Sequence, residues 1–213
     1  MMHLVKTLGV IALASVIGCA STWVGIDGKV GQSVKLIVYK TEKETFACTA
    51  AIINEKQSYL ATAAHCMPEG PALTRVDGIE WHPIAVNTTL DLAVIQAIGI
   101  QGPALKLRKG LVDIGLPVAI AGMGLSGHLK FTFGHVASLS DSALAQGLLF
   151  DCTNFPGNSG GVVVDESGRI VAVSQGFIAA VFTKGDGTKE EAPVLAYGSR
   201  QGELRAFLAP YLP

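Results

Sequence analysis

The sequence predicts an all-β protein, built as a sandwich or a barrel. Short runs rich in Val, Ile, Thr and aromatic residues alternate with turn-forming residues along most of the chain. No internal repeat is visible, which argues against a propeller or a solenoid. The 213 residues are 49% hydrophobic and 15% charged, which supplies enough apolar side chains for one large β domain or two small ones that share a core.

Six strands are expected in the first half of the chain. A charged turn at residues 41–44, a polar turn at residues 54–57 and the pair Asp77-Gly78 separate several of them. The expected strands span residues 33–39, 46–53, 59–63, 74–76, 81–86 and 92–97. Segments with Gly and Pro follow at residues 99–103 and 110–115. We therefore place the first half at about residues 33–112 and the second at about residues 116–198.

The second half repeats this pattern and ends in a helix. Asp165 to Gly168 has the composition of a hairpin turn. Leu204, Phe207 and Leu208 recur at helical spacing, which predicts a helix over residues 199–208 with Ser199 as its N-cap. The expected strands span residues 118–121, 129–133, 135–138, 148–151, 161–164, 170–174 and 194–197.

The first 18 residues predict an export signal. Lys6 precedes a short apolar segment at residues 8–16, which falls short of the ~20 residues that span a bilayer. Residues 16–19, Val-Ile-Gly-Cys, resemble the lipobox of bacterial lipoproteins, in which Cys19 would carry the lipid. Ordinary cleavage after Ala20 is the alternative; we favour the lipobox because a small residue and Cys directly follow the apolar segment. Residues 19–32 show little periodicity and are expected to be a linker.

The charge of the chain narrows the range of partners. A net charge of −1 argues against nucleic-acid binding. Contact with a membrane is expected only through the N-terminal lipid, on the periplasmic face of a bacterial membrane. Without the lipid, the protein would be periplasmic or secreted. No cofactor and no metal ion are expected.

Three motifs hold candidate catalytic side chains. Ser159 lies within Gly-Asn-Ser-Gly-Gly at residues 157–161, where glycines permit a tight turn and backbone N–H groups can stabilise an oxyanion. A nucleophilic serine also needs a base and a group that orients the base. His65 is the fourth residue of Thr-Ala-Ala-His-Cys at residues 62–66, and Asp91 opens Asp-Leu-Ala-Val.

The chain order His65, Asp91, Ser159 resembles that of the trypsin/chymotrypsin superfamily of serine proteases. The resemblance extends over about residues 30–208. Pro-Gly-Asn-Ser-Gly-Gly at residues 156–161 is more similar to the bacterial periplasmic Deg-type proteases than to the digestive enzymes, which carry Asp before the Ser. The resemblance implies two six-stranded antiparallel Greek-key barrels (the chymotrypsin-like fold) with a short C-terminal helix. No peptide-binding domain of the kind that often follows in Deg-type enzymes is expected.

The resemblance also implies a role for each site residue. Ser159 would be the nucleophile, His65 the general base, and Asp91 the group that holds the tautomer of His65. The backbone N–H groups of Gly157 and Ser159 would form the oxyanion hole, and we expect an unusual backbone conformation at Gly157. Asn158 replaces the Asp that pairs with a new N-terminus in zymogen-activated relatives, so no activation by N-terminal cleavage is expected.

Substrate recognition is expected on both sides of the nucleophile. Ser174, Gln175 and Gly176 would form an edge strand that pairs with an extended peptide or protein substrate. Thr153 and Asn154 would lie at the floor of the specificity pocket. Because Thr153 takes the place of the Asp found in trypsin-like enzymes, small or apolar substrate side chains are expected.

The cysteines are assigned in the same way. The resemblance implies a disulfide between Cys48 and Cys66, which suits an oxidising compartment. Cys152 is then left without a partner and is expected to pack as a small buried hydrophobic residue.

We therefore predict an exported serine endopeptidase. One alternative is a catalytically silent binding protein on a protease fold, since a fold does not determine function. All three catalytic positions are present, which favours the enzyme. The other alternative is an esterase of the α/β-hydrolase type, but its triad order differs and it needs alternating strands and helices.

Overall fold

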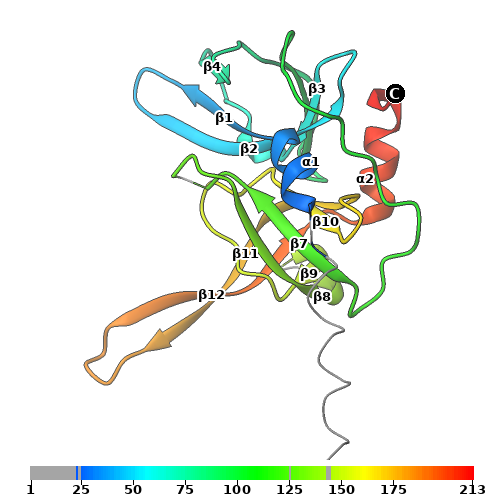
Figure 1. Ribbon diagram of the computed structural model, residues 1–213. Coiled ribbons are helices and arrows are strands. Elements are labelled where there is room, and N and C mark those ends of the chain that lie inside the picture. The colour runs from blue at the N-terminus through cyan, green and yellow to red at the C-terminus, as the bar shows by residue number, and fades with distance from the viewer. Residues whose placement is uncertain (1–22, 24, 125, 143–144) are drawn as a thin grey trace, which may run out of the picture.

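The computed structural model describes residues 23, 25–124, 126–142 and 145–213. It contains two six-stranded antiparallel β units, arranged one above the other in Figure 1. This confirms the predicted fold: mostly β structure in two barrel-like sheets of the chymotrypsin type, with a short C-terminal helix. The expected signal peptide and Cys19 lie outside the described residues.

The first unit is a sheet with the strand order β4-β1-β2-β3-β6-β5. Its side chains pack on a core that includes Trp81, Ile52 and Leu60. Its strands are β1 (Val34–Lys40), β2 (Thr45–Asn54), β3 (Tyr59–Thr62), β4 (Leu73–Val76), β5 (His82–Asn87) and β6 (Leu92–Gln96).

The second unit is a closed barrel with the order β10-β11-β12-β9-β8-β7. Phe150, Ile120 and Val171 lie in its core, and a further apolar cluster joins residues of both units. Its strands are β7 (Pro117–Gly122), β8 (Lys130–Ser142), β9 (Ala145–Phe150), β10 (Val162–Asp165), β11 (Ile170–Thr183) and β12 (Lys189–Gly198).

The strands of the second unit are longer than expected. β8 is one continuous strand where we expected two, because Gly134 leaves room for Asp151: a Cβ at this glycine would lie 2.2 Å from Asp151 Oδ1. β11 and β12 also continue beyond the expected residues 170–174 and 194–197. Their outer parts form a two-stranded arm that leaves the body of the molecule (Figure 1).

The expected linker at residues 19–32 is wrong in its second part. Residues Ile26–Ser33 form helix α1, in which Ile26 and Val30 are buried in the cluster between the units. Ser33 Oγ lies within hydrogen-bond distance of Lys29 O in the helix and of Pro103 O in the connector, so its single hydrogen is shared between these two acceptors. The helix was not expected because it is short and contains Gly28 and Gly31.

The C-terminal helix α2 (Gln201–Leu208) buries Leu204 and Leu208, and a short 3-10 turn η2 (Ala209–Tyr211) follows. The predicted N-cap at Ser199 is wrong, because Arg200 occupies the cap position, without a side-chain cap. The Ser199 hydroxyl instead accepts a hydrogen bond from Val173 N. No helix among the described residues has the length and apolar character needed to cross a membrane.

Candidate active site

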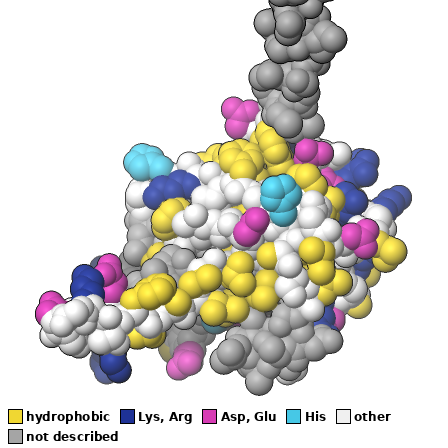
Figure 2. All heavy atoms as spheres, turned by 90° about the horizontal axis from the view of Figure 1, so that it is seen from below, with side chains coloured by type: hydrophobic (Ala, Val, Ile, Leu, Met, Phe, Trp, Pro, Cys, Tyr) yellow, Lys and Arg dark blue, Asp and Glu magenta, His cyan; other side chains and the backbone are white. Residues whose placement is uncertain are grey.

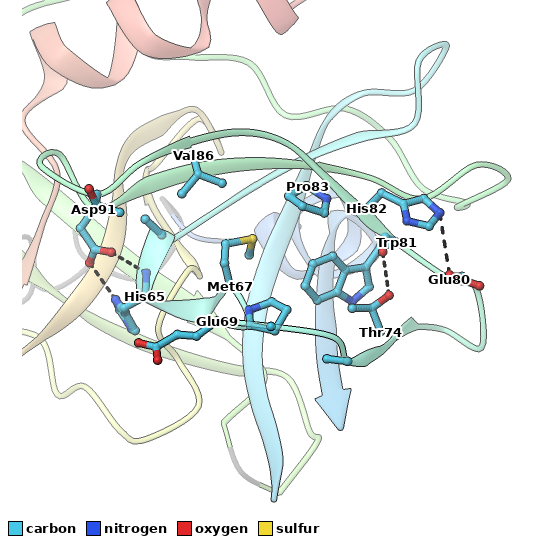
Figure 3. Close-up of a pocket in the computed structure, with 15 residues that line it drawn as sticks. His65, Met67, Glu69, Thr74, Glu80, Trp81, His82, Pro83, Val86 and Asp91 are labelled. Atoms are coloured by element: carbon cyan, nitrogen blue, oxygen red, sulfur yellow. Dashed lines mark hydrogen bonds and ion pairs between the residues drawn. The ribbon is translucent and has the colours of Figure 1, made fainter. Parts of the chain in front are cut away.

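His65 and Asp91 are joined by two hydrogen bonds. A 3-10 turn η1 (Ala64–Cys66) directly after β3 carries His65, and Asp91 lies in the turn that leads into β6. His65 Nδ1 lies 2.8 Å from Asp91 Oδ2, and His65 N donates to Asp91 Oδ1 at 2.9 Å (Figure 3). With Nδ1 held by the carboxylate, Nε2 is the ring nitrogen left to exchange a proton with another group.

Ser159 lies in the turn that precedes β10, and both units hold the backbone of this turn. Thr49 N of β2 donates to Ser159 O at 2.8 Å, and Gly160 N donates to Ser174 O at 2.8 Å. Gly160 has φ 78°, and a Cβ there would lie 2.1 Å from Thr62 Oγ1, so only glycine fits. The hydrogen bonds among the described residues do not include one from Ser159 Oγ to His65; in enzymes without substrate this contact is often long.

Two backbone N–H groups of the Ser159 turn have no hydrogen-bond acceptor among the described residues. The N–H groups of Asn158, Gly160 and Gly161 donate to backbone oxygens of the same region. Those of Gly157 and Ser159 have no hydrogen-bond acceptor in the described part of the chain. Gly157 has φ 89°, in the left-handed region that favours glycine. This arrangement leaves two neighbouring donors available to a negatively charged oxygen.

Thr49 is a site residue that the sequence reasoning missed. Its buried hydroxyl donates to Gly157 O at 2.7 Å and accepts from Met123 N at 3.0 Å. The Thr49 hydroxyl therefore holds the Ser159 turn through Gly157, whose N–H group is one of the two without an acceptor. The sequence contains no signal for this role, because a threonine within an apolar strand is common.

Asn154 and Thr153 differ in their surroundings. Asn154 is buried, and its Nδ2 donates to Ser174 Oγ at 3.0 Å and to Gly176 O at 2.8 Å, while its Oδ1 accepts from Phe155 N. Thr153 is exposed, and its carbonyl accepts from Thr132 Oγ1. Asn154 thus ties the loop that leads to Ser159 to β11.

Tyr197 is a second site residue that the sequence did not predict. A Cβ at Gly176 would lie 2.8 Å from the ring of Tyr197, so the ring lies directly against this glycine. Burial, and to a smaller extent the charge of Asp91, raise the pKa of the Tyr197 hydroxyl. The ring and Asn154 together narrow the space beside Gly176.

Gln175 links the second unit to the Asp91 turn. Its buried side chain donates from Nε2 to Leu90 O at 2.7 Å and to Asp91 O at 3.1 Å. The side chain therefore points away from any substrate on the strand edge and holds the backbone of the turn that presents the carboxylate of Asp91.

Asn158, next to Ser159, is buried and has no hydrogen-bond partner for Oδ1 or Nδ2 among the described residues. It lies against Gly122, where a Cβ would come within 2.6 Å of Asn158 Oδ1.

A cavity of 690 Å³ opens beside His65 (Figure 3). Trp81, Met67 and Val86 supply apolar walls, and Glu69 and Glu80 supply acidic ones. His65 and Asp91 lie at one end of this cavity and His82 at the other, so a bound chain could reach the imidazole from this side.

The three cysteines in the described part of the chain are arranged as predicted. Cys48 of β2 and Cys66 of η1 form a disulfide that ties the His65 turn to the neighbouring strand. The two cysteines and His65 are close enough to share a metal ion, but the disulfide occupies both thiols. Cys152 is buried and unpaired, and burial, with the charge of Asp151, raises its pKa to about 12.

Two six-stranded β units, with His65 and Asp91 on the first and Ser159 on the second, define a protein with the chymotrypsin-type fold. A comparison with protein families makes the assignment narrower. The family described as trypsin-like peptidase domain matches residues 48–173, more than half of the chain, and the protein belongs to this family of proteases. No curated protein matches the chain.

Solved structures with the same fold include the Rv3671c protease of M. tuberculosis. Its active form has a TM-score of 0.72 at 16% identity, over 98% of this chain and 93% of that chain. An inactive form with a serine-to-alanine mutation has a TM-score of 0.70 at 16% identity, over 94% and 98%. Another inactive form has a TM-score of 0.67 at 16% identity, over 87% and 91%.

Proposed function

We propose that this protein is an exported serine endopeptidase that cleaves peptide bonds through an acyl-enzyme. The observation that carries the proposal is the pair of N–H groups at Gly157 and Ser159, which have no acceptor in the described part of the chain; Ser159 O lies 3.7 Å from Sγ of Cys66, the residue next to His65. Donors of this kind stabilise the charge that develops on a carbonyl oxygen during acyl transfer.

The proposed reaction starts at Ser159 Oγ, which attacks the carbonyl carbon of the scissile bond while His65 Nε2 accepts the hydroxyl proton. The oxyanion accepts hydrogen bonds from Gly157 N and Ser159 N. His65 then gives the proton to the departing amine, and the acyl group stays on Ser159. A water molecule, deprotonated by His65, releases the acyl group in a second round. Asp91 stabilises the imidazolium without taking its proton.

An extended peptide substrate would lie on β11 at residues 174–176, as an added strand. The space beside Gly176, narrowed by Asn154 and Tyr197, favours small substrate side chains. The disulfide supports a place outside the cytoplasm. The lipid anchor at Cys19 remains a proposal, and incorporation of labelled fatty acid into the wild type but not Cys19→Ala would test it.

The serine is tested with a fluorophosphonate probe on the purified domain. We expect labelling of the wild type and of Ser167→Ala, a matched control at an exposed turn serine, and none of Ser159→Ala. Peptide hydrolysis by Ser159→Ala should fall by about 10⁶-fold. A folded wild-type protein that neither reacts with the probe nor cleaves any member of a peptide library would contradict the proposal and favour the silent binding protein.

A further inference from the structure

One edge of β11 is open beyond the nucleophile turn. On this edge β11 pairs with β10 only over residues 170–173. On its other edge it pairs with β12 from Ser174 to Thr183. Beyond Ser174, no backbone hydrogen bond between described residues reaches β11 from the β10 side; the one contact is from Asn154 Nδ2 to Gly176 O. From Gly176 to Thr183 the strand thus has no partner strand on this edge, which leaves the N–H and C=O groups of about every second residue unpaired.

The open edge belongs to an unusually apolar strand. Residues 170–182 contain no charged residue and no proline. In the outer part, Val181 and Phe182 are 56% and 55% exposed, and Val194 of β12 is 53% exposed. Figure 2 shows hydrophobic side chains along the arm, while charged ones gather at its tip, where Lys184 pairs with Glu190. Long apolar edges are usually shortened, charged or covered, so an uncovered one indicates a partner strand.

The open edge is continuous with the candidate active site. Ser174 N donates to Gly161 O and Gly160 N donates to Ser174 O, so the turn that carries Ser159 occupies this edge up to Ser174. A polypeptide that leaves the site along β11 therefore meets the arm next, on the same side. From Gly176 to Thr183 the edge is about 23 Å long, at ~3.3 Å per residue.

We propose that the β11–β12 arm is an extended substrate-binding surface. It takes a stretch of about seven residues of the substrate, remote from the scissile bond, as an added antiparallel or parallel strand along residues 177–183. The surface is apolar, so the preferred stretch is uncharged and rich in β-branched or aromatic residues. This inference rests on the proposed function, and it makes unfolded or extended polypeptides the substrate class in place of short peptides.

Two variants, one that removes the surface and one that places a charge on it, leave the proposed catalytic residues in place. The first replaces residues 179–194 by Asn-Gly, which closes a tight hairpin between Ile178 and its register partner Leu195. The second, Val181→Lys, keeps the arm and places a charge on it, in case the shortened protein does not fold. Ile84→Lys is the matched control, since Ile84 is an exposed apolar residue on β5 of the other unit.

Activity is measured on peptides that share one cleaved core and carry either no extension or eight alternating Val and Thr residues on either side. For the wild type and Ile84→Lys, extension on one side should raise kcat/KM about tenfold or more, because several cross-strand pairs are added. Both arm variants should lose this gain and keep the kcat/KM of the short peptide. An equal gain in the shortened variant would overturn the proposal.

Binding separates this inference from the proposed function. Fluorescein-labelled Val-Thr peptides of four and twelve residues are titrated into Ser159→Ala protein with and without the shortened arm. Tighter binding of the long peptide only when the arm is intact supports the surface even if no peptide is cleaved. Equal binding of both lengths overturns it. A wild type that is dimeric through the arm, with no preference for long peptides, would assign the edge to a second copy and also overturn it.

Discussion

Single side chains of the first β unit hold the turn that carries Ser159, which belongs to the second unit. Thr49 is the main example, because its hydroxyl lies between Gly157 O and Met123 N and its backbone N–H bonds to Ser159 O. A buried hydroxyl with two partners leaves both unpaired when it is removed, at a cost of about 1–3 kcal/mol for each lost partner.

Thr49→Val should therefore lower kcat by about tenfold to a hundredfold, since it releases the peptide unit next to the N–H groups that we propose as the oxyanion hole. Steady-state kinetics on a short peptide measure this effect, and KM should change little. Thr49→Ser keeps the hydroxyl and is the control, which should retain most of the activity. Equal kcat values for Val and Ser would show that the hydroxyl does not position the turn.

Cys152 ties stability to pH through a single thiol. Burial raises its pKa to about 12 from an ordinary value of 9.0, so the thiol is protonated in the folded and unfolded states below pH 9. Above this, only the unfolded state ionises. The free energy of unfolding should then fall by about 1.4 kcal/mol per pH unit as the pH rises from 9 towards 12.

Denaturant titrations of wild type and Cys152→Ala across this pH range provide the test, because every other titrating group is shared. The free energy of unfolding of the wild type minus that of the variant should decrease as the pH rises, because only the wild type loses stability through the thiol. In addition, iodoacetamide at pH 8 should leave Cys152 of the folded protein unmodified. A difference that does not depend on pH would mean that burial does not raise the pKa of the Cys152 thiol.

At the scale of elements, helix α1 shows that the packed domain begins before residue 33, the start expected from the sequence. It packs Ile26 and Val30 into the cluster between the two units, and Ser33 joins it to the connector at Pro103. A Cβ at Gly168, in the β10–β11 turn, would lie 3.3 Å from Val30 Cγ2, so the helix also lies against the second unit. The segment before β1 is thus part of the packed structure.

Val30→Ala should lower the free energy of unfolding by about 1–3 kcal/mol, because the site is fully buried and the methyl groups leave a cavity. Lys29→Ala, on the exposed face of the same helix, should change it by no more than about 0.5 kcal/mol. Chemical denaturation measures both variants. If Val30→Ala were as stable as Lys29→Ala, α1 would behave as the linker that the sequence suggested.

For the whole molecule, the important contacts are those that join the two units at the site. Gln175 of the second unit bonds to Leu90 O and Asp91 O of the first, and Thr49 of the first bonds to the Ser159 turn of the second. The distance between His65 and Ser159 therefore depends on how the units meet. Small shifts of one unit against the other should affect catalysis before they affect folding.

Gln175→Leu should lower kcat by about tenfold, because it removes both hydrogen bonds to the Asp91 turn and leaves two carbonyls unpaired. The pH profile of kcat/KM should also change, since the carboxylate that orients His65 would be less well held. Gln96→Leu is the control: it removes a bond to Gln57 O within the first unit, away from the site. Equal effects of the two variants on the pH profile would rule out a positioning role for Gln175.

Local patterns in the sequence were sufficient for most strands, for the α2 helix and for the motifs that hold the candidate residues His65, Asp91 and Ser159, whereas the Cys48–Cys66 disulfide was implied only by the family resemblance. Their signals are close in sequence: alternating apolar residues, turn residues and short motifs with glycine. These patterns depend on neighbours a few residues apart, which is why the sequence alone predicts them.

Other features depended on contacts between distant segments. The roles of Thr49, Tyr197 and the Gln175 side chain come from residues that are distant in the sequence or lie on a paired strand. For example, Thr49 is 108 positions from Gly157 and 74 positions from Met123. The continuous β8 and the packing of α1 likewise depend on what lies opposite Gly134 and Val30. The sequence by itself determined the fold class and the motifs that hold the candidate catalytic residues, because both depend on residues that are close together in the chain. Only the tertiary structure decided which buried groups support the site and which edge of β11 stays open, because pairing and burial are properties of segments brought together by folding.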